Sequence, residues 1–478
     1  MMSAMSNARW LTLSQGSRVI MQLISLFVLS RLLQPSEYGL LAMATVATNF
    51  AFLLRDMGTA AAVVQKENLT EETTSSVFWL NVGMGVFLTL ALIIASPLLA
   101  AYFRIDRLAP VLCLLSIVFP ITSASAVHQA LLERRSGFQT VARIEIISSL
   151  VGLTVAITLA FLGYGVYSLV WNTLASAICS SVQLWTTSPW RPKKIWNNAE
   201  LRSLWGFSGN LTGFNFINFF ARNADSMVIG RVLGSIQLGI YAQAYKVMMF
   251  PLQSMSYVVG RALFPVMSRQ QTEREKMGQL YFRSIRLIAT LTAPMMAGLW
   301  LLREPFVLIA LGDQWGKVPM VLAWLAPVGF LQSLISTTGS VFMATGRTDL
   351  MMRLGLLGSV LQVGSFLIGV QWGIEGVACC YLIANVLNGI PHFYFATKQL
   401  NSSLMGLFRE IWQPVLFALL MTAALYPLFS FLSGTSLAAL IVFAVTTLAG
   451  AIIYGALIVI FSKDVVQSCK KMIGMKTA

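Results

Sequence analysis

Charged residues, histidines and cysteines are scarce in this chain of 478 residues. Only 11% of the residues are charged, 18 residues are acidic, and there are two histidines and five cysteines. The cysteines and histidines show no metal-ligand spacing, so we expect buried thiols and no metal site. Nucleophile elbows, Walker motifs and other phosphate-binding glycine loops are also absent, and the sequence therefore predicts neither ATP binding nor a cofactor.

Apolar residues, by contrast, make up 57% of the chain, and the mean hydropathy is +0.74. This composition is too apolar for a soluble globular protein and predicts an all-α polytopic membrane protein. The net charge of +15 raises the question of a nucleic-acid partner. We exclude that partner because the basic residues lie in short loops between apolar segments and do not form a basic domain.

Apolar stretches of membrane-spanning length recur along the whole chain. With a window of about 17–25 residues, the sequence predicts about 14 transmembrane helices. Their approximate limits are residues 9–33, 38–64, 76–103, 109–132, 144–162, 166–187, 203–232, 238–262, 281–302, 319–345, 352–370, 375–396, 411–432 and 437–461. Alternate loops then carry about 22 basic residues on one side and about 6 on the other, and the positive-inside rule predicts that both termini are cytoplasmic.

Two segments of the sequence resemble each other at an offset of about 200 residues. The first is Arg31-Leu-Leu-Gln-Pro-Ser-Glu-Tyr-Gly39, and the second is Arg231-Val-Leu-Gly-Ser-Ile-Gln-Leu-Gly239. Arg143 and Arg353 likewise each open a span that ends in a glycine turn. Spans one to six therefore match spans seven to twelve, as parallel repeats about an axis along the membrane normal. We expect an N-lobe at residues 1–195, a C-lobe at 196–400, and two accessory spans with a basic tail at 401–478.

Polar side chains line one face of the seventh predicted span at intervals of three or four residues. They are Ser208, Thr212, Asn215, Asn218, Arg222 and Asp225. At the repeat offset, the first span carries Thr12, Gln15, Arg18, Gln22 and Ser25. Polar groups are costly in hydrocarbon, so such a stripe must face a protein interior or a water-filled cavity. We expect these two pseudo-symmetric helices to line one central cavity.

Basic side chains outnumber acidic ones within the predicted spans. The basic ones are Arg18, Arg55, Arg222, Lys246 and Arg261, and the acidic ones are Asp56 and Asp225, with Glu145 at a span end. Helical spacing predicts that Arg222 pairs with Asp225. The excess positive charge favours an anionic ligand, since a guanidinium gives phosphate two parallel hydrogen bonds. The alternative is that these charges form ion pairs that only fix packing, and that Arg261 extends to the cytoplasmic interface.

Several segments resemble a known family. Ser30-Arg-Leu-Leu-Gln-Pro-Ser-Glu-Tyr-Gly39, Ala62-Val-Val-Gln-Lys66 and Asp225-Ser-Met-Val-Ile-Gly230 are similar to the polysaccharide-exporter branch of the multidrug/oligosaccharidyl-lipid/polysaccharide (MOP) flippases. The chain most resembles Wzx-type lipid-linked oligosaccharide flippases of the colanic-acid-exporter kind. The resemblance implies two six-helix lobes around a central V-shaped cavity, with two accessory helices.

By that resemblance, the protein would be a flippase and not an enzyme. It would move an undecaprenyl-diphosphate-linked oligosaccharide across the bacterial inner membrane by alternating access, for lipopolysaccharide O-antigen, capsule or exopolysaccharide. Arg18 and Arg55 match positions at which the related lipid II flippases keep arginines, and Lys246 or Arg261 would fill the matching role in the eighth span.

Further roles follow from the same expectation. Arg222 would join Arg18 and Arg55 at the pyrophosphate, and Asp225 or Asp56 would take up a proton. Hydrogen bonds to the phosphate or the first sugar would come from Gln15, Gln22, Asn215 and Asn218. We expect a monomer in contact with membrane lipid, and polysaccharide polymerase and synthesis proteins as further partners.

Two other functions remain open at this point. A cation- or proton-coupled drug antiporter of the same superfamily would need unpaired carboxylates in its cavity, and the excess of basic residues argues against it. A membrane glycan polymerase or ligase would need acid and base residues in a large external loop. The largest predicted external loop, residues 303–318, offers only Glu304 and Asp313, which need no catalytic role.

Overall fold

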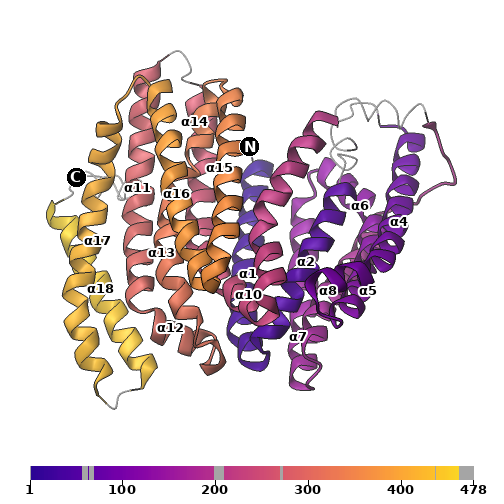
Figure 1. Cartoon of the computed structure of the whole chain (residues 1–478). Helices are drawn as coiled ribbons and strands as arrows, with labels where there is room; N and C mark the ends of the chain where they lie inside the picture. The colour runs from indigo at the N-terminus through magenta and orange to yellow at the C-terminus, as the bar shows by residue number, and fades with distance from the viewer. Residues whose placement is uncertain are drawn as a thin grey trace. The chain divides into compact units, whose positions relative to one another are not determined.

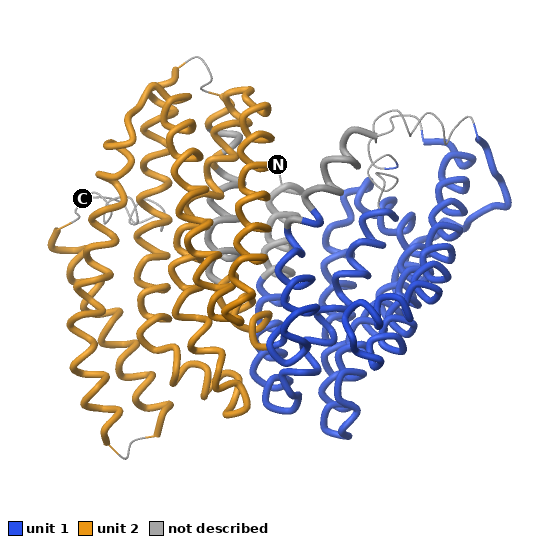
Figure 2. Tube along the Cα trace, viewed as in Figure 1, with its two compact units in different colours: residues 1–239 blue, residues 240–478 orange. Residues whose placement is uncertain are grey.

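The computed structural model describes the backbone of residues 2–55, 63, 69–198, 209–269, 273–435 and 438–461. Within these residues the regular structure is helical, and no strand occurs. The chain divides into two compact units, residues 1–239 and 240–478 (Figure 2). The lobe boundaries expected from the sequence repeat stay a prediction.

Unit 1 is built from the helices of the first repeat and the first part of a long helix, α10 (Figure 1). Its elements are α1 (Met2–Leu32), α2 (Pro35–Arg55), α4 (Glu71–Phe103), α5 (Leu108–Ser116), α6 (Val118–Arg134), α7 (Phe138–Phe161), α8 (Val166–Thr187) and the beginning of α10 (Gly209–Ser268). Leu29 of α1 and Leu33, just after its end, pack with Leu153 and Ala156 of α7, and these contacts bury one apolar cluster.

Unit 2 contains the rest of α10 and the remaining helices. They are α11 (Arg274–Leu301), α12 (Arg303–Ala310), η1 (Asp313–Trp315), α13 (Val318–Ile335), α14 (Thr338–Ala344), α15 (Thr348–Gly369), η2 (Val370–Trp372), α16 (Gly373–Gln399), α17 (Leu404–Ser433) and α18 (Ala439–Phe461). Tyr281 and Ile285 of α11 lie in one buried cluster with Phe342 of α14 and Leu354 of α15. The accessory helix α17 joins a second cluster through Phe417 and other apolar side chains.

The helices are long and apolar enough to cross a membrane repeatedly. Nine helical stretches of the described residues meet that standard of length and hydropathy, and each predicted span overlaps a helix. Large apolar side chains point outward on them, as at Ile94 and Leu98 of α4, which are 75% and 73% exposed. The chain is therefore a multi-pass membrane protein whose outer surface suits lipid.

The beginning of α4 is capped by a threonine side chain. Thr70 is the N-cap residue, and its hydroxyl accepts a 3.1 Å hydrogen bond from the backbone N–H of Thr73. Glu71 and Glu72 lie in the first helical turn, where carboxylates favour the exposed N–H groups.

Two predicted connections differ from the structure. The predicted spans 203–232 and 238–262 leave room for a turn at about residues 234–237, which the structure reduces to Gly234, the residue of α10 with non-helical angles, at φ 82°. Glycine takes this left-handed angle without steric cost, so the helix resumes at the next residue. The expected external loop at residues 303–318 is also largely helical, because α12 and η1 occupy it.

The two repeated segments contact each other inside unit 1. A Cβ atom on Gly39 would overlap the backbone carbonyl of Ser235, and a Cβ atom on Gly239 would overlap the backbone carbonyl of Pro35. At the repeat offset of about 200, Gly39 corresponds to Gly239 and Pro35 to Ser235. The contact is thus made twice with exchanged roles, and at both places only glycine leaves room for the backbone of the other repeated segment.

Candidate functional site

Arg18 and Glu145 form an ion pair between α1 and α7. The guanidinium Nη2 lies 3.3 Å from the carboxylate Oε2, and the two side chains are 58% and 38% exposed. The sequence left Arg18 without an acid on its own helix and placed Glu145 at a span end. Because α7 already begins at Phe138, Glu145 lies inside the helix, on a face that packs against α1.

Arg55 is held at the end of α2 by two neighbours. Its Nη1 donates a 2.6 Å hydrogen bond to the hydroxyl of Thr122 on α6. Its guanidinium carbon lies 4.8 Å from the ring centroid of Phe52, which in turn packs edge-on against Phe119 of α6. These contacts fix the guanidinium between α2 and α6, where part of it stays accessible.

The polar stripe of α10 contains both exposed and buried groups. Arg222 is exposed, whereas Asp225 is only 8% exposed and accepts a 2.6 Å hydrogen bond from the backbone N–H of Ser226. In the described part of the chain no ion pair joins Arg222 to Asp225, so the pair expected from their spacing is not formed. The carboxylate is held by its own backbone, and Arg222 is exposed.

The other predicted site residues divide between the two units. Gln22 is half-buried on α1, one turn beyond Arg18 in unit 1, and Lys246 is half-buried on α10 in unit 2. The side chains of Gln15, Asn215, Asn218, Arg261 and Asp56 lie outside the described residues. Of the predicted basic residues, unit 1 therefore carries Arg18, Arg55 and Arg222, all at least partly accessible.

Unit 2 contains a polar network that sequence reasoning missed. The amide nitrogen of Gln332 on α13 donates to the hydroxyl of Tyr381 at 2.6 Å and to the amide oxygen of Asn385 at 3.2 Å. Asn388 and His392 continue the same face of α16, and the His392 Nδ1 lies 2.9 Å from the Asn388 carbonyl oxygen. The spacing of four, three and four residues from Tyr381 to His392 was the signal for this stripe.

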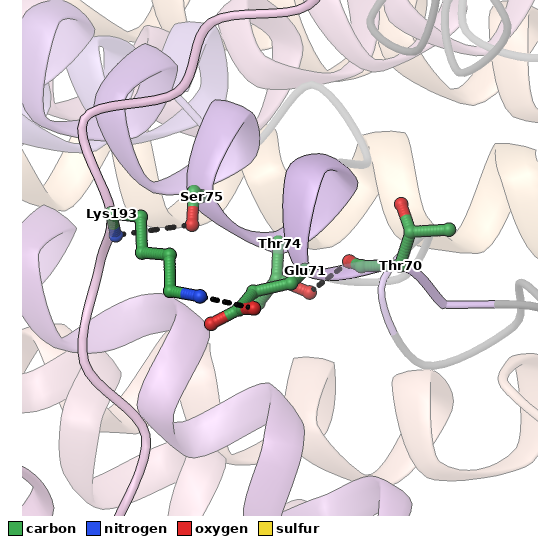
Figure 3. Close-up of polar contacts among 5 residues, drawn as sticks. All are labelled: Thr70, Glu71, Thr74, Ser75 and Lys193. Carbon is green, nitrogen blue, oxygen red and sulfur yellow. Dashed lines mark hydrogen bonds and ion pairs between the residues drawn. The ribbon is translucent and has the colours of Figure 1, made fainter.

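A second network fastens the chain after α8 to the beginning of α4 (Figure 3). We call residues 188–198 the strap. The backbone N–H of Lys193 donates to the Ser75 hydroxyl at 3.2 Å, and its Nζ lies 2.7 Å from the Glu71 Oε2. Trp79 adds a 2.8 Å bond from its indole N–H to the Lys193 carbonyl. The strap thus lies across the first turns of α4.

No group of three or more His, Cys, Asp and Glu side chains within the described residues is arranged to hold a metal ion. The chemistry available at the accessible surface of unit 1 is that of guanidinium groups, a carboxylate and amides. Such groups bind an anion with several acceptor oxygens through charge-assisted hydrogen bonds.

The sequence profile of a family described as "Polysaccharide biosynthesis protein" matches residues 28–319. The chain is 26% identical over 440 residues to the lipopolysaccharide biosynthesis protein WzxC of Escherichia coli K12, covering 90% of this chain and 88% of that protein. It is 28% identical over 464 residues to the succinoglycan biosynthesis transport protein ExoT of Rhizobium meliloti 1021, covering 96% of this chain and 94% of that protein.

The fold is that of a known transporter structure. The lipid II flippase MurJ, in an inward closed conformation, superposes with a TM-score of 0.77 over 95% of this chain and 99% of its own. The sequence identity over that superposition is 15%, so the likeness concerns the fold.

Proposed function

Because this chain belongs to the family of polysaccharide biosynthesis proteins, we propose that it is a flippase for a lipid-linked oligosaccharide. It translocates an undecaprenyl-diphosphate-linked glycan from the inner to the outer leaflet of the bacterial cytoplasmic membrane by alternating access. The glycan then serves the synthesis of a surface polysaccharide. The protein itself makes and breaks no covalent bond.

The observation that carries this proposal is likeness over nearly the whole chain to proteins of polysaccharide export. WzxC is named for lipopolysaccharide biosynthesis, and ExoT is named as a transport protein of succinoglycan biosynthesis. These two polymers differ, yet both relatives match at least nine-tenths of this chain. The function that they share with this protein therefore does not depend on one particular sugar polymer. We propose that the common substrate is a lipid-linked precursor of the polysaccharide.

The proposed topology has fourteen spans, six in each lobe and two accessory ones, with both termini in the cytoplasm. The overlap of every predicted span with a helix supports it, as does the excess of basic residues in alternate loops. The protein acts as a monomer in contact with membrane lipid, and polymerase and synthesis proteins are further partners.

The diphosphate is the part of the substrate that the basic side chains would recognise. Arg18, Arg55 and Arg222 hold it, and Lys246 is a further basic residue of the proposed site. The amides of Gln15, Gln22, Asn215 and Asn218 bind phosphate or the first sugar, and Arg261 supplies a further charge. Each arginine presents several N–H donors in one plane, which suits two phosphates with adjacent oxygens.

The test measures undecaprenyl-linked oligosaccharide and surface polysaccharide together, in cells lacking the protein. These cells are complemented with wild type, with Arg222→Gln, or with Arg353→Gln as a control at an exposed basic residue of α15. Accumulated lipid-linked glycan that wild type and Arg353→Gln clear, and Arg222→Gln does not, is the expected result. Membrane abundance of each variant is measured in parallel.

Two other outcomes have distinct meanings. Full rescue by Arg222→Gln keeps the flippase and reduces Arg222 to a packing role. Unchanged glycan pools without the protein, together with altered sensitivity to cationic drugs, refute the flippase and favour the drug antiporter of the same superfamily.

A further inference from the structure

We propose that Glu145 is the internal counter-ion of Arg18, and that the diphosphate of the substrate displaces it on binding. Glu145 is then a positioning residue that acts through Arg18 and need not touch the substrate itself. This inference rests on the proposed function, since it assumes that Arg18 binds a diphosphate. It adds the carboxylate of Glu145 to a site that otherwise consists of basic and amide side chains.

The first support is the geometry of the pair. The guanidinium Nη2 lies 3.3 Å from the carboxylate Oε2, which is longer than the roughly 2.7–2.9 Å of a close charge-assisted hydrogen bond. The two side chains are 58% and 38% exposed, so water competes for both groups. An exposed pair of this kind contributes little free energy and is easily exchanged.

The second support is where the pair lies. Both residues belong to helices of membrane-spanning length, and both keep a substantial exposed surface within unit 1. Charged groups on that surface cannot face hydrocarbon and must face water or a ligand. A carboxylate placed there neutralises Arg18 while the site is empty, and this lowers the cost of holding an arginine at membrane depth.

The third support comes from the neighbours of Glu145. The helix α8 packs along α7 but has no charged residue between Val166 and Thr187. Its Gln183 donates to the Ser148 hydroxyl at 3.0 Å, one turn beyond Glu145. Arg18 of α1 forms an ion pair with this carboxylate, Arg143 lies two residues before it on α7, and Glu133 and Arg134 stand at the end of α6, which also packs against α7.

An incoming diphosphate changes this balance. It carries more negative charge than a carboxylate and presents several oxygens to the guanidinium fork, so it replaces Glu145 at Arg18. When the substrate leaves, the carboxylate takes Arg18 back. Glu145 thereby competes with the diphosphate for Arg18, weakens its binding and favours its release. A transporter needs release as much as binding.

The experiment uses the purified full-length protein and farnesyl diphosphate as a short, soluble probe. Glu145→Gln keeps the size of the side chain and removes its charge, so the dissociation constant should fall about two- to fivefold. The matched control is Glu71→Gln, which breaks another exposed ion pair of unit 1, the 2.7 Å contact to Lys193 with side chains 50% and 58% exposed. It should leave the dissociation constant unchanged.

A double-mutant cycle tests whether Glu145 acts through Arg18. In the Arg18→Gln background, Glu145→Gln should produce no further tightening, because the competition has already been removed. Thermal unfolding of the four proteins shows whether the pair has a merely structural role, in which case Glu145→Gln lowers stability and does not tighten binding.

The outcomes separate this inference from the proposed function. If correctly folded Glu145→Gln binds the probe no more tightly than wild type, the counter-ion role is wrong and the flippase stands. If wild type itself does not bind the diphosphate, and cells lacking it keep normal lipid-linked glycan pools, the proposed function fails as well.

Discussion

Arg55 on α2 donates a 2.6 Å hydrogen bond to the hydroxyl of Thr122 on α6. The same hydroxyl donates to the carbonyl of Val118, so Thr122 is tied to its own helix and offers Arg55 a fixed acceptor. A guanidinium anchored in this way loses less freedom when a ligand binds to its remaining N–H groups. Thr122 thus holds in place Arg55, one of the side chains that are predicted to bind the diphosphate.

Replacing Thr122 with valine removes that acceptor and preserves the shape of the side chain. We expect the dissociation constant for farnesyl diphosphate to rise about three- to tenfold, because Arg55 loses a fixed acceptor and the ligand must then order more of the guanidinium. The control is Thr154→Val on α7, whose exposed hydroxyl donates to the carbonyl of Leu150 on its own helix. Equal affinity for both variants and wild type would argue against a supporting role.

The two repeated segments cross at Gly39 and Gly239, and we call this contact the glycine crossing. Adding a single methyl group at either glycine should destabilise the protein. Gly39→Ala brings a Cβ atom against the Ser235 carbonyl, and relief requires a shift of backbone. We expect a loss of about 1–3 kcal/mol in stability, as for overpacked cores. Gly83→Ala on α4 meets no atom within 4 Å and should be neutral or stabilise by up to about 1 kcal/mol. Thermal unfolding in detergent compares the two, and similar midpoints would contradict the crossing.

The strap offers a comparison between a charge and a buried hydroxyl. Lys193→Met removes the exposed ion pair with Glu71, which should cost at most about 1 kcal/mol. Ser75→Ala removes the hydroxyl that accepts from the backbone N–H of Lys193, and because the Ser75 side chain is fully buried the change should cost about 1–3 kcal/mol. Hydrogen exchange of residues 188–198 should therefore speed up more in Ser75→Ala. The reverse order would show that the ion pair dominates.

The proposed topology can be tested by labelling single cysteines from each side of the membrane. In a variant without the native cysteines, Lys317→Cys is expected to react with a membrane-impermeant thiol reagent added to the periplasmic side, and Asn198→Cys only after the inner membrane is opened. Both positions are exposed. Reaction of Asn198→Cys from outside would invert the topology.

The sequence predicted the helical architecture well because membrane spans leave a strong signal. Long apolar runs recur, and the basic residues alternate between the two sides. Local chemistry was equally readable at the beginning of α4, where Thr70 caps the helix as its type and position suggest. The break in α10 was harder, because one glycine replaces a turn of four residues.

Side-chain partners were much less predictable. The spacing of Arg222 and Asp225 suggested a pair on one helix, but the aspartate is buried against its own backbone. The partner of Arg18 comes from α7, more than a hundred residues away, and no local pattern connects the two. Pairing across helices depends on tertiary packing, which sequence periodicity does not encode.

The mutual contact of the repeated turns has a consequence for how the two halves evolve. After a duplication, copies normally diverge independently, each under its own constraints. Here each copy limits the space that is available to the other. A larger side chain at Gly39 would displace Ser235, and a shift of Pro35 would change the space at Gly239. This stretch should retain the ancestral likeness longest and change by paired substitutions, which explains why the duplication is still legible there in a single sequence.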